Sequence, residues 1–535
     1  MPTRHGSRRS LDLLARGQPW VWVTAGGIAT ALLMIVGLLL LVLINGLTAY
    51  WPERVARVRL QDGTTLLGEF TRTEAGRRLL RTGNFDLTGK DFQWVEDAQI
   101  AGEDHPGEAW VFERLEWGRF YGSLREVRLD DRPVVPAPDR FRELHGAARR
   151  RLAEIRRIEK HDLGAVFAEM ERLRLAVRKA DVRHGPGSSA VEAARRRARE
   201  REPGLEQETA ALNRRLEELK QEDRRATVVL ADVNGREKVH RVSEVVRAYP
   251  ANELGLPGRL AVYGSRWWEF LSSEPREFNT EGGIFPAIFG TVLMTLIMSV
   301  VIVPFGVIAA LYLREYARQG ALVSTVRIAV NNLAGVPSIV FGIFGLGFFC
   351  YLVGGRIDAL FHPEKLPAPT FGTQGLLWAS LTLALLTVPV VIVATEEALA
   401  AVPQSLREGS YGCGASRWQT IRRIVLPKAM PGIMTGLILA MARGAGEVAP
   451  LMLTGVVKLA EVPVDGHFPF LHLERSFMHL GFHIYDVGLQ SRNSEAGKPT
   501  VFVTTLVLIL VVAVLNLAAI WVRGRLRRRY GSERF

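Results

Sequence analysis

Long runs of apolar residues without charge divide the chain into membrane-sized segments. A helix needs about 20 apolar residues to cross roughly 30 Å of hydrocarbon. Six stretches meet or approach that length, and they are residues 20–50, 282–313, 328–355, 376–395, 430–457 and 501–522. The first stretch is too long for a signal-peptide core of about 7–15 residues. The pattern therefore predicts six transmembrane helices, the first of them a retained anchor.

The segment between the first two spans, residues 51–280, has a different pattern. Apolar and polar residues alternate near both of its ends, which is typical of short strands, and Asn234-Gly235 predicts a β-hairpin turn. Between residues 139 and 225, apolar residues recur three or four apart, which predicts two helical arms. We expect a small β domain that is interrupted by an antiparallel helical hairpin. The hairpin is either an arm for a partner or a self-packed coiled coil without a ligand.

Positive charge lies mainly beside the apolar runs. The chain has 68 lysines and arginines against 55 acidic residues, a net charge of +13, and 48% of its residues are hydrophobic. Basic residues that flank a span stay on the cytoplasmic side, whereas long domains are translocated largely regardless of charge. We therefore expect residues 1–19, the loop 396–430 and the tail 524–535 in the cytoplasm, and residues 51–280 in the periplasm. This distribution indicates a multi-pass protein of a bacterial inner membrane, surrounded by lipid, and argues against a nucleic-acid partner.

Catalytic and metal chemistry have no support in the sequence. The two cysteines, Cys350 and Cys413, form no CxxC pair, and the scattered histidines fit no zinc template. The sequence has no GxxxxGK[ST] loop to hold a nucleotide phosphate, and no nucleophile–base constellation stands out. We expect a chain without enzyme activity, bound metal or cofactor of its own.

A basic, glycine-containing loop between the fourth and fifth spans carries the most specific motif. Glycines permit a tight reversal there, and the flanking apolar residues favour a helix-turn-helix. By physics alone, an amphipathic connector at the interface is the simpler explanation. The residues that define the motif are Glu408, Gly409, Ser410, Gly414, Ile424, Leu426 and Pro427. Their spacing resembles the EAA loop of ABC importer permeases, with glycine and serine in place of the two alanines. In that family the loop is the coupling helix that inserts into the ATPase subunit.

Four further stretches narrow the resemblance. Residues 282–317, 331–347, 381–399 and 442–455 are similar to the PstA-type permeases of phosphate importers. The resemblance covers roughly residue 281 to the end of the chain, including the implied permease domain at 281–523, and more loosely the first span. It implies an all-α membrane fold of type I ABC importer permease architecture, to which this chain adds a periplasmic α+β insertion. It also implies a second permease subunit, a dimer of ATP-binding ABC subunits that holds ATP and Mg²⁺, and a periplasmic phosphate-binding protein.

Two polar features interrupt the apolar spans. Arg443 and Glu447 are four residues apart, which predicts one helical face near the middle of the fifth span. A charge in hydrocarbon costs at least about 2.5–3.5 kcal/mol, so we expect the pair to face the bundle or a wet cavity. It is either a structural ion pair or, as the family resemblance implies, a site that attracts a translocating oxyanion. Asn331 and Asn332 interrupt the third span and either line the path or mark a simple helix break.

The sequence thus predicts the permease subunit of an ATP-driven inorganic phosphate importer, which forms half of the translocation path and couples to the ATPase through residues 396–430. A permease for another oxyanion, sulfate or molybdate, is the nearest alternative, because arginine recognises any tetrahedral anion. A membrane-anchored phosphate-signalling scaffold is the alternative from another functional class.

Overall fold

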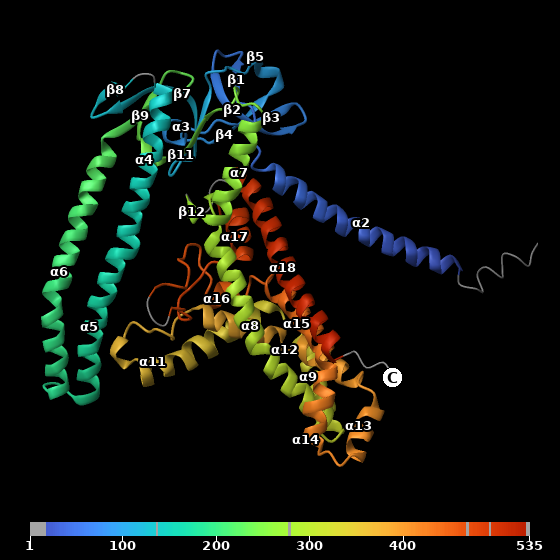
Figure 1. Cartoon of the computed structure of the whole chain (residues 1–535). Helices are drawn as coiled ribbons and strands as arrows, with labels where there is room; N and C mark the ends of the chain where they lie inside the picture. Colours follow the sequence, from blue (N-terminus) through green and yellow to red (C-terminus); the bar gives the residue numbers. More distant parts are fainter. Residues whose placement is uncertain (1–17, 135–136, 277–279, 467–469, 492–493, 531–535) are drawn as a thin grey trace, which may run out of the picture.

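The computed structural model describes residues 18–134, 137–276, 280–466, 470–491 and 494–530. Figure 1 shows a helical bundle, two β-sheets beside one end of that bundle, and a long pair of helices that runs from the sheets alongside the bundle. The N-terminal segment 1–17 and the last residues, 531–535, lie outside the described residues. The basic tail predicted at 524–535 is helical through Tyr530, because the last helix continues past its apolar part.

The six predicted spans are confirmed: six helices of the described residues are long and apolar enough to cross a membrane. They are α2 (Gln18–Thr48), α8 (Phe285–Leu311) with the π-turn η5 (Tyr312–Tyr316), α10 (Ser338–Phe344) with η6 (Gly345–Gly354) and α11 (Gly355–Phe361), α12 (Leu376–Ala400), α14 (Arg417–Thr420) with η8 (Ile421–Val425) and α15 (Leu426–Gly444), and α18 (Ser494–Tyr530).

The predicted bounds of the third and fifth spans are wrong. A separate helix, α9 (Ala321–Leu333), occupies the start of the predicted third span, and the spanning helix begins only at Ser338. Pro337 explains the break, because proline lacks the N–H that a continuous helix would use. The fifth span covers Arg417–Gly444 instead of residues 430–457.

Small residues bring the central helices of the bundle together. Helix α12 packs between α8 and α15, and about two thirds of the residues in its most apolar stretch are buried. A Cβ built at Gly436 of α15 would lie 2.5 Å from Cβ of Ala394 on α12, and one at Gly306 of α8 would lie 2.6 Å from Cγ1 of Val391. Membrane helices associate through such close backbone approach, since lipid removes the hydrophobic driving force.

Most of helix α2 extends away from the other helices of the bundle (Figure 1). It contacts α18 near its C-terminal end, where a Cβ built at Gly46 would lie 3.0 Å from Cδ2 of Leu506. The Tyr263 hydroxyl also donates to the Leu47 carbonyl over 2.8 Å. Most apolar side chains between Trp20 and Leu47 are exposed in the isolated chain. The first span is therefore held at one end and offers the rest of its surface to lipid or to another subunit.

The predicted β domain contains two antiparallel sheets, which share a hydrophobic core. The first has the strand order β4-β3-β2-β1-β5, and the second the order β10-β9-β7-β6-β11 with β8 paired to β7. The strands are β1 (Ala56–Leu60), β2 (Thr65–Glu74), β3 (Arg77–Arg81), β4 (Phe92–Glu96), β5 (Ile100–Asp104), β6 (Trp110–Arg114), β7 (Arg119–Leu129), β8 (Arg132–Val134), β9 (Ala226–Ala231), β10 (Glu237–Arg241) and β11 (Val245–Pro250). Only the second sheet is interrupted by the helical pair, which connects β8 to β9.

The helical pair is long and antiparallel. One arm consists of α4 (Ala137–Arg157), η2 (Ile158–Asp162) and α5 (Leu163–His184), and the other arm is α6 (Ser189–Arg224). At about 1.5 Å per residue, the 36 residues of α6 span roughly 54 Å. The Ser188 side chain caps α6 by accepting from Val191 N. Far from the sheets, Lys179 lies 3.8 Å from Glu364 in η7 (Pro363–Lys365), directly after the third span.

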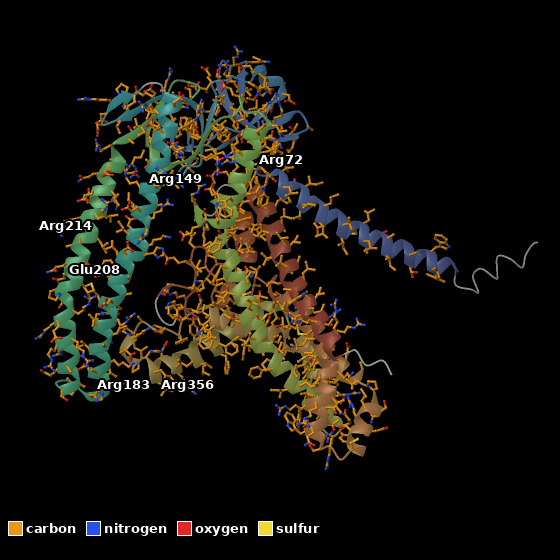
Figure 2. All side chains as sticks on the ribbon, in the orientation of Figure 1. Arg72, Arg149, Arg183, Glu208, Arg214 and Arg356 are labelled. Carbon is orange, nitrogen blue, oxygen red and sulfur yellow. The ribbon has the colours of Figure 1, made fainter. Side chains whose placement is uncertain are left out.

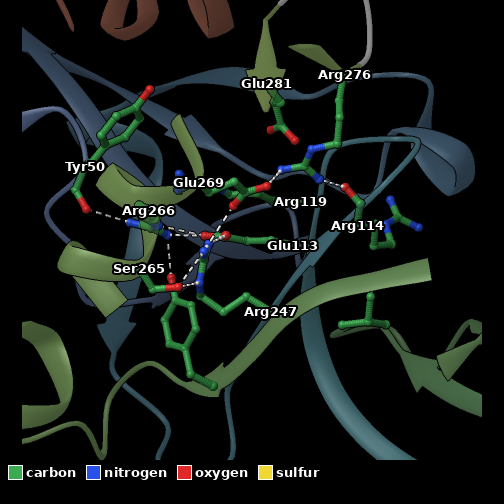
Figure 3. A network of polar contacts seen from close by, with 12 residues as sticks. Tyr50, Glu113, Arg114, Arg119, Arg247, Ser265, Arg266, Glu269, Arg276 and Glu281 are labelled. Carbon is green, nitrogen blue, oxygen red and sulfur yellow. Dashed lines mark hydrogen bonds and ion pairs between the residues drawn. The ribbon is translucent and has the colours of Figure 1, made fainter. Parts of the chain in front are cut away.

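A network of ion pairs fastens the sheets to the membrane bundle (Figure 3). Arg266 of α7 (Leu256–Ser272) donates from Nε to Oε1 of Glu113 on β6 over 2.7 Å, and from Nη1 to the Tyr50 carbonyl after α2 over 3.0 Å. Glu269 accepts from Arg247 of β11 and from Arg276, at 3.0 and 2.6 Å. These contacts join both ends of the insertion to the end of the first span.

Candidate functional site

The predicted loop motif folds into a compact helical hairpin at the end of the bundle opposite the sheets (Figure 1). Glu408, Gly409 and Ser410 lie in α13 (Gln404–Gly412), and α14 follows after a short turn. Gly414 in that turn has φ +80°, a left-handed conformation that a residue with a Cβ resists. Ile424 lies in η8, and Leu426 and Pro427 open α15. We call α13 and α14, with the turn between them, the α13–α14 hairpin.

Local hydrogen bonds make this hairpin rigid. Ser410 Oγ and Thr420 Oγ1 are 2.9 Å apart and share a hydrogen bond between its two arms. Ser416 and Gln419 form a capping box at the start of α14, which satisfies two backbone donors. Glu408 and Gly409 are exposed, and so are three large apolar side chains nearby, Leu406, Tyr411 and Trp418. The hairpin therefore combines a fixed shape with an unusual apolar surface.

Side-chain contacts that were not predicted from sequence tie the hairpin to the bundle. Arg407 Nη1 lies 3.0 Å from Glu315 Oε1 in η5, and Arg407 Nη2 donates to the Leu399 carbonyl of α12 over 2.8 Å. Arg417 stacks over the Tyr316 ring, 5.2 Å from its centroid. The available signal in the sequence was Glu315, a lone acidic residue between Arg314 and Arg318 after the second span. The hairpin is thus bonded to the ends of both α8 and α12.

Arg443 and Glu447 approach each other, but they do so across a helix end. Helix α15 stops at Gly444, and Glu447 lies in the turn before α16 (Leu451–Thr454). The expectation that the pair shares one face of a continuous helix is therefore wrong; Gly444 and Gly446 end the helix. Arg443 Nε is 3.6 Å from Glu447 Oε1, which is beyond a good hydrogen bond.

This helix end lies at mid-depth in the bundle. A Cβ built at Gly444 would lie 2.6 Å from Sδ of Met298, which is the central residue of α8 (Phe285–Leu311). The Arg443 side chain is 38% exposed and that of Glu447 is 22% exposed in the isolated chain. A permanently charged guanidinium with a loose ion pair is therefore accessible beside the middle of α8 in the isolated chain.

Asn331 and Asn332 lie in the last turn of α9, and both are exposed. Leu333 and Val336, just beyond them, pack against a buried hydrophobic cluster that contains Ala440. Ala440 lies about one helical turn before Arg443. Among the described residues, no hydrogen bond or ion pair links either asparagine to Arg443 or Glu447. The asparagines therefore lie in the permease bundle without touching the ion pair.

Other polar groups of the spans have structural partners. Glu396 of α12 accepts from Arg327 of α9 over 3.2 Å. The buried ring of His479 accepts from Gly481 N and caps α17 (Leu480–Tyr485), while His472 lies 3.0 Å from both Asp465 and Glu474. In the part of the chain that the structure describes, no group of three or more His, Cys, Asp or Glu residues is arranged to hold a metal.

Comparison with known proteins places this geometry in a family. Residues 302–532 match the binding-protein-dependent transport system inner membrane components. The phosphate transport system permease protein PstA 1 of Mycobacterium tuberculosis (strain CDC 1551 / Oshkosh) is 36% identical over 276 residues, which are 51% of this chain and 81% of that relative. PstA of Mycobacterium leprae is 36% identical over 49% of this chain and 77% of the relative. PstC of Mesorhizobium japonicum is 35% identical over 34% of this chain and 58% of the relative.

The region matched by the family model begins within α8 and contains the later spans, the α13–α14 hairpin and the Arg443–Glu447 pair. Since the match covers most of a relative at 36% identity, the chain belongs to the PstA-type permeases of the binding-protein-dependent transport system inner membrane components.

Proposed function

We propose that this multi-pass inner-membrane protein is the permease subunit of an ATP-driven importer of inorganic phosphate and forms half of the translocation path. The assignment of phosphate as the substrate is supported by the 36% identity to a phosphate transport system permease over 81% of the length of that relative. As members of an ABC permease family require, the chain works with an ATPase subunit and a substrate-binding protein. The roles of the α13–α14 hairpin and of Arg443 are inferred from their geometry.

The α13–α14 hairpin is the part that receives the movement of the ATPase. Its exposed Leu406, Tyr411 and Trp418 supply the apolar contact that a partner groove would bury. Because Arg407 joins the hairpin to Glu315 and to the Leu399 carbonyl, a displacement of the hairpin reaches α8 and α12 directly. ATP and Mg²⁺ are bound by the partner ATPase dimer, since this sequence carries no phosphate-binding loop of its own.

Arg443 is the group that meets the anion. Its guanidinium offers parallel donors that match a tetrahedral oxyanion, and its 3.6 Å separation from Glu447 leaves those donors free for a stronger partner. Glu447 neutralises the cation when no anion is bound and repels the anion as the cavity changes shape. Asn331 and Asn332, which are exposed at the end of α9, complete the polar lining. A second permease subunit supplies the other wall of the path.

The orientation follows from the same assignment. The hairpin contacts a cytoplasmic ATPase, so both termini are cytoplasmic and the two sheets with the helical pair are periplasmic. A periplasmic phosphate-binding protein delivers the anion on that side.

ATP-dependent phosphate uptake by the reconstituted complex tests the proposal. The Arg443→Ala variant should assemble with the ATPase and lose uptake, because a neutral side chain offers no charge to the anion. The matched control is Arg356→Ala, which removes an exposed arginine at the far end of the third span and should retain uptake. Sulfate and molybdate should compete poorly with labelled phosphate; efficient competition would assign another oxyanion. Loss of assembly in Arg443→Ala would show instead that the ion pair is structural.

A further inference from the structure

The far end of the helical pair is strongly basic. Residues 172–199, which we call the tip, contain nine arginines and lysines against Asp181 and Glu192, a net charge of +7. Arg183, Arg195, Arg196 and Arg197 are exposed, and within the described residues none of them has a carboxylate at ion-pair distance. Exposed basic residues on a coiled coil usually alternate with acidic ones. These four arginines thus have no acidic partner among the described residues.

The tip lies at the level where the third span leaves the membrane. Lys179 is 3.8 Å from Glu364, and Arg178 donates to the Leu366 carbonyl. Both acceptors follow within a few residues of Phe361, the last residue of the third span. The Leu360 and Phe361 side chains are 74% and 61% exposed in the isolated chain, as expected of a surface that faces lipid. Figure 2 shows Arg183 of the tip close to Arg356 of α11 in that view.

The tip points along the bundle, away from the sheets (Figure 1). From Arg178 to the turn at Gly185 the helix advances about 10 Å, at about 1.5 Å per residue. The headgroup layer on each side of the hydrocarbon is about 5–8 Å thick. A tip that is anchored at the end of a span and extends that far reaches the depth of the lipid headgroups.

We propose that the tip binds the anionic headgroups of the leaflet opposite the α13–α14 hairpin. Lipid phosphates within a Debye length of about 8–10 Å attract unpaired cations, and arginine forks bind phosphate oxygens by two parallel hydrogen bonds. The helical pair then has two fixed ends, one in the second sheet and one on the membrane surface beside η7. The contact does not depend on the proposed function, which decides only that this leaflet is the outer one.

Fluorescence quenching in lipid nanodiscs tests the contact with the full chain. Val182 in the tip is 51% exposed, so Val182→Cys accepts a fluorophore. Cys413→Ser removes the exposed native thiol, and Cys350 is buried. A headgroup-attached spin label should quench the probe in discs that contain phosphatidylglycerol. Quenching should be lost in phosphatidylcholine discs and at high salt, since screening weakens exposed charge contacts.

Charge reversal provides the matched comparison. Arg195→Glu, Arg196→Glu and Arg197→Glu together should abolish the quenching. Arg150→Glu, Arg156→Glu and Arg214→Glu change the same number of exposed arginines in the part of the pair nearer the sheets, and should leave the quenching intact. Equal quenching in both lipids and in both triple variants would overturn the proposal. So would a probe that is never quenched by lipid and becomes shielded only when the other subunits are added, which would assign the tip to a protein contact.

Discussion

Arg407 and Glu315 form a buried ion pair between the α13–α14 hairpin and the end of α8, with Nη1 and Oε1 3.0 Å apart and side chains that are 14% and 7% exposed. The same guanidinium donates to the Leu399 carbonyl of α12. One side chain therefore bonds the hairpin to two spans. A push on the hairpin moves both spans, whereas a freely jointed loop would absorb it.

Removing one member of this pair should destabilise the chain and uncouple it. Arg407→Ala leaves a buried carboxylate alone, which costs about 3–5 kcal/mol. We expect a lower free energy of unfolding and, in assembled complexes, less phosphate transported per ATP hydrolysed. The double variant Arg407→Met/Glu315→Leu should regain much of the stability, because no buried charge remains, but not the coupling. If the losses of unfolding free energy in Arg407→Met and in Glu315→Leu simply added up in the double variant, the two side chains would not interact.

The hairpin turn should tolerate alanine at one glycine and not at the other. Gly414→Ala forces a Cβ into φ +80° and should cost about 1 kcal/mol or more. Gly409→Ala lies within α13 with open space around it and should stabilise the helix by roughly 1 kcal/mol. Thermal unfolding and ATPase binding of the two variants measure the difference. Equal effects would show that the turn adapts in the complex.

The α12–α15 contact should respond to a swap of methyl groups. Gly436→Ala places a Cβ 2.5 Å from Cβ of Ala394 and should destabilise the bundle by about 1–3 kcal/mol through overpacking. Adding Ala394→Gly removes the clash and should restore most of the loss. Unfolding in nanodiscs compares the two single variants with the double. No recovery in the double variant would mean that the helices are held apart by other contacts.

Acid should weaken the attachment of the sheets through Glu113. Burial raises the pKa of this carboxyl, but the guanidinium groups of Arg266 and Arg247 outweigh that effect and hold the pKa well below its ordinary value of 4.5. The folded state thus binds fewer protons than the unfolded state. The resulting stability is complete above about pH 5 and is lost as the pH falls below 4.5 towards the folded pKa.

Glu113→Gln isolates this contribution. The variant should be about 3–5 kcal/mol less stable at pH 7, because Arg266 and Arg247 lose their charged partner. The difference from the unmodified chain should shrink as the pH is lowered from 5 to 3. Melting curves of the two proteins across that range provide the measurement, and a constant difference would contradict the ion-pair explanation.

The spans were predictable from sequence because an apolar helix in lipid satisfies its own backbone, so length and composition suffice. Where those helices end depends on local breakers. Gly444 and Gly446 were visible between Arg443 and Glu447, yet four-residue spacing was interpreted as a helical face. The predicted secondary structure of the pair was therefore wrong, because Arg443 lies in the last turn of α15 and Glu447 lies beyond the end of that helix.

The contacts between distant segments were not predictable in the same way. Glu315 and Arg407 are separated by the third and fourth spans, and nothing local to either residue selects the other among many nearby charges. The two sheets present a similar case. Alternation identifies strands, but the pairing of β7 with β9 spans the helical pair inserted between them. Such pairings are decided by packing and closure of the complete fold.

The attachment of α2 imposes an order on biosynthesis. Its packing partner near Gly46 is Leu506, 460 residues further along the chain. At about 5–20 residues per second, the first span waits roughly 20–90 s for that contact. Until then the anchor is held by lipid and, once α7 has been made, by the hydrogen bond from Tyr263 to the Leu47 carbonyl. Most apolar side chains of α2 are exposed in the isolated chain. The lipid bilayer solvates such a surface, so the helix is stable in the membrane before its partner helix is made.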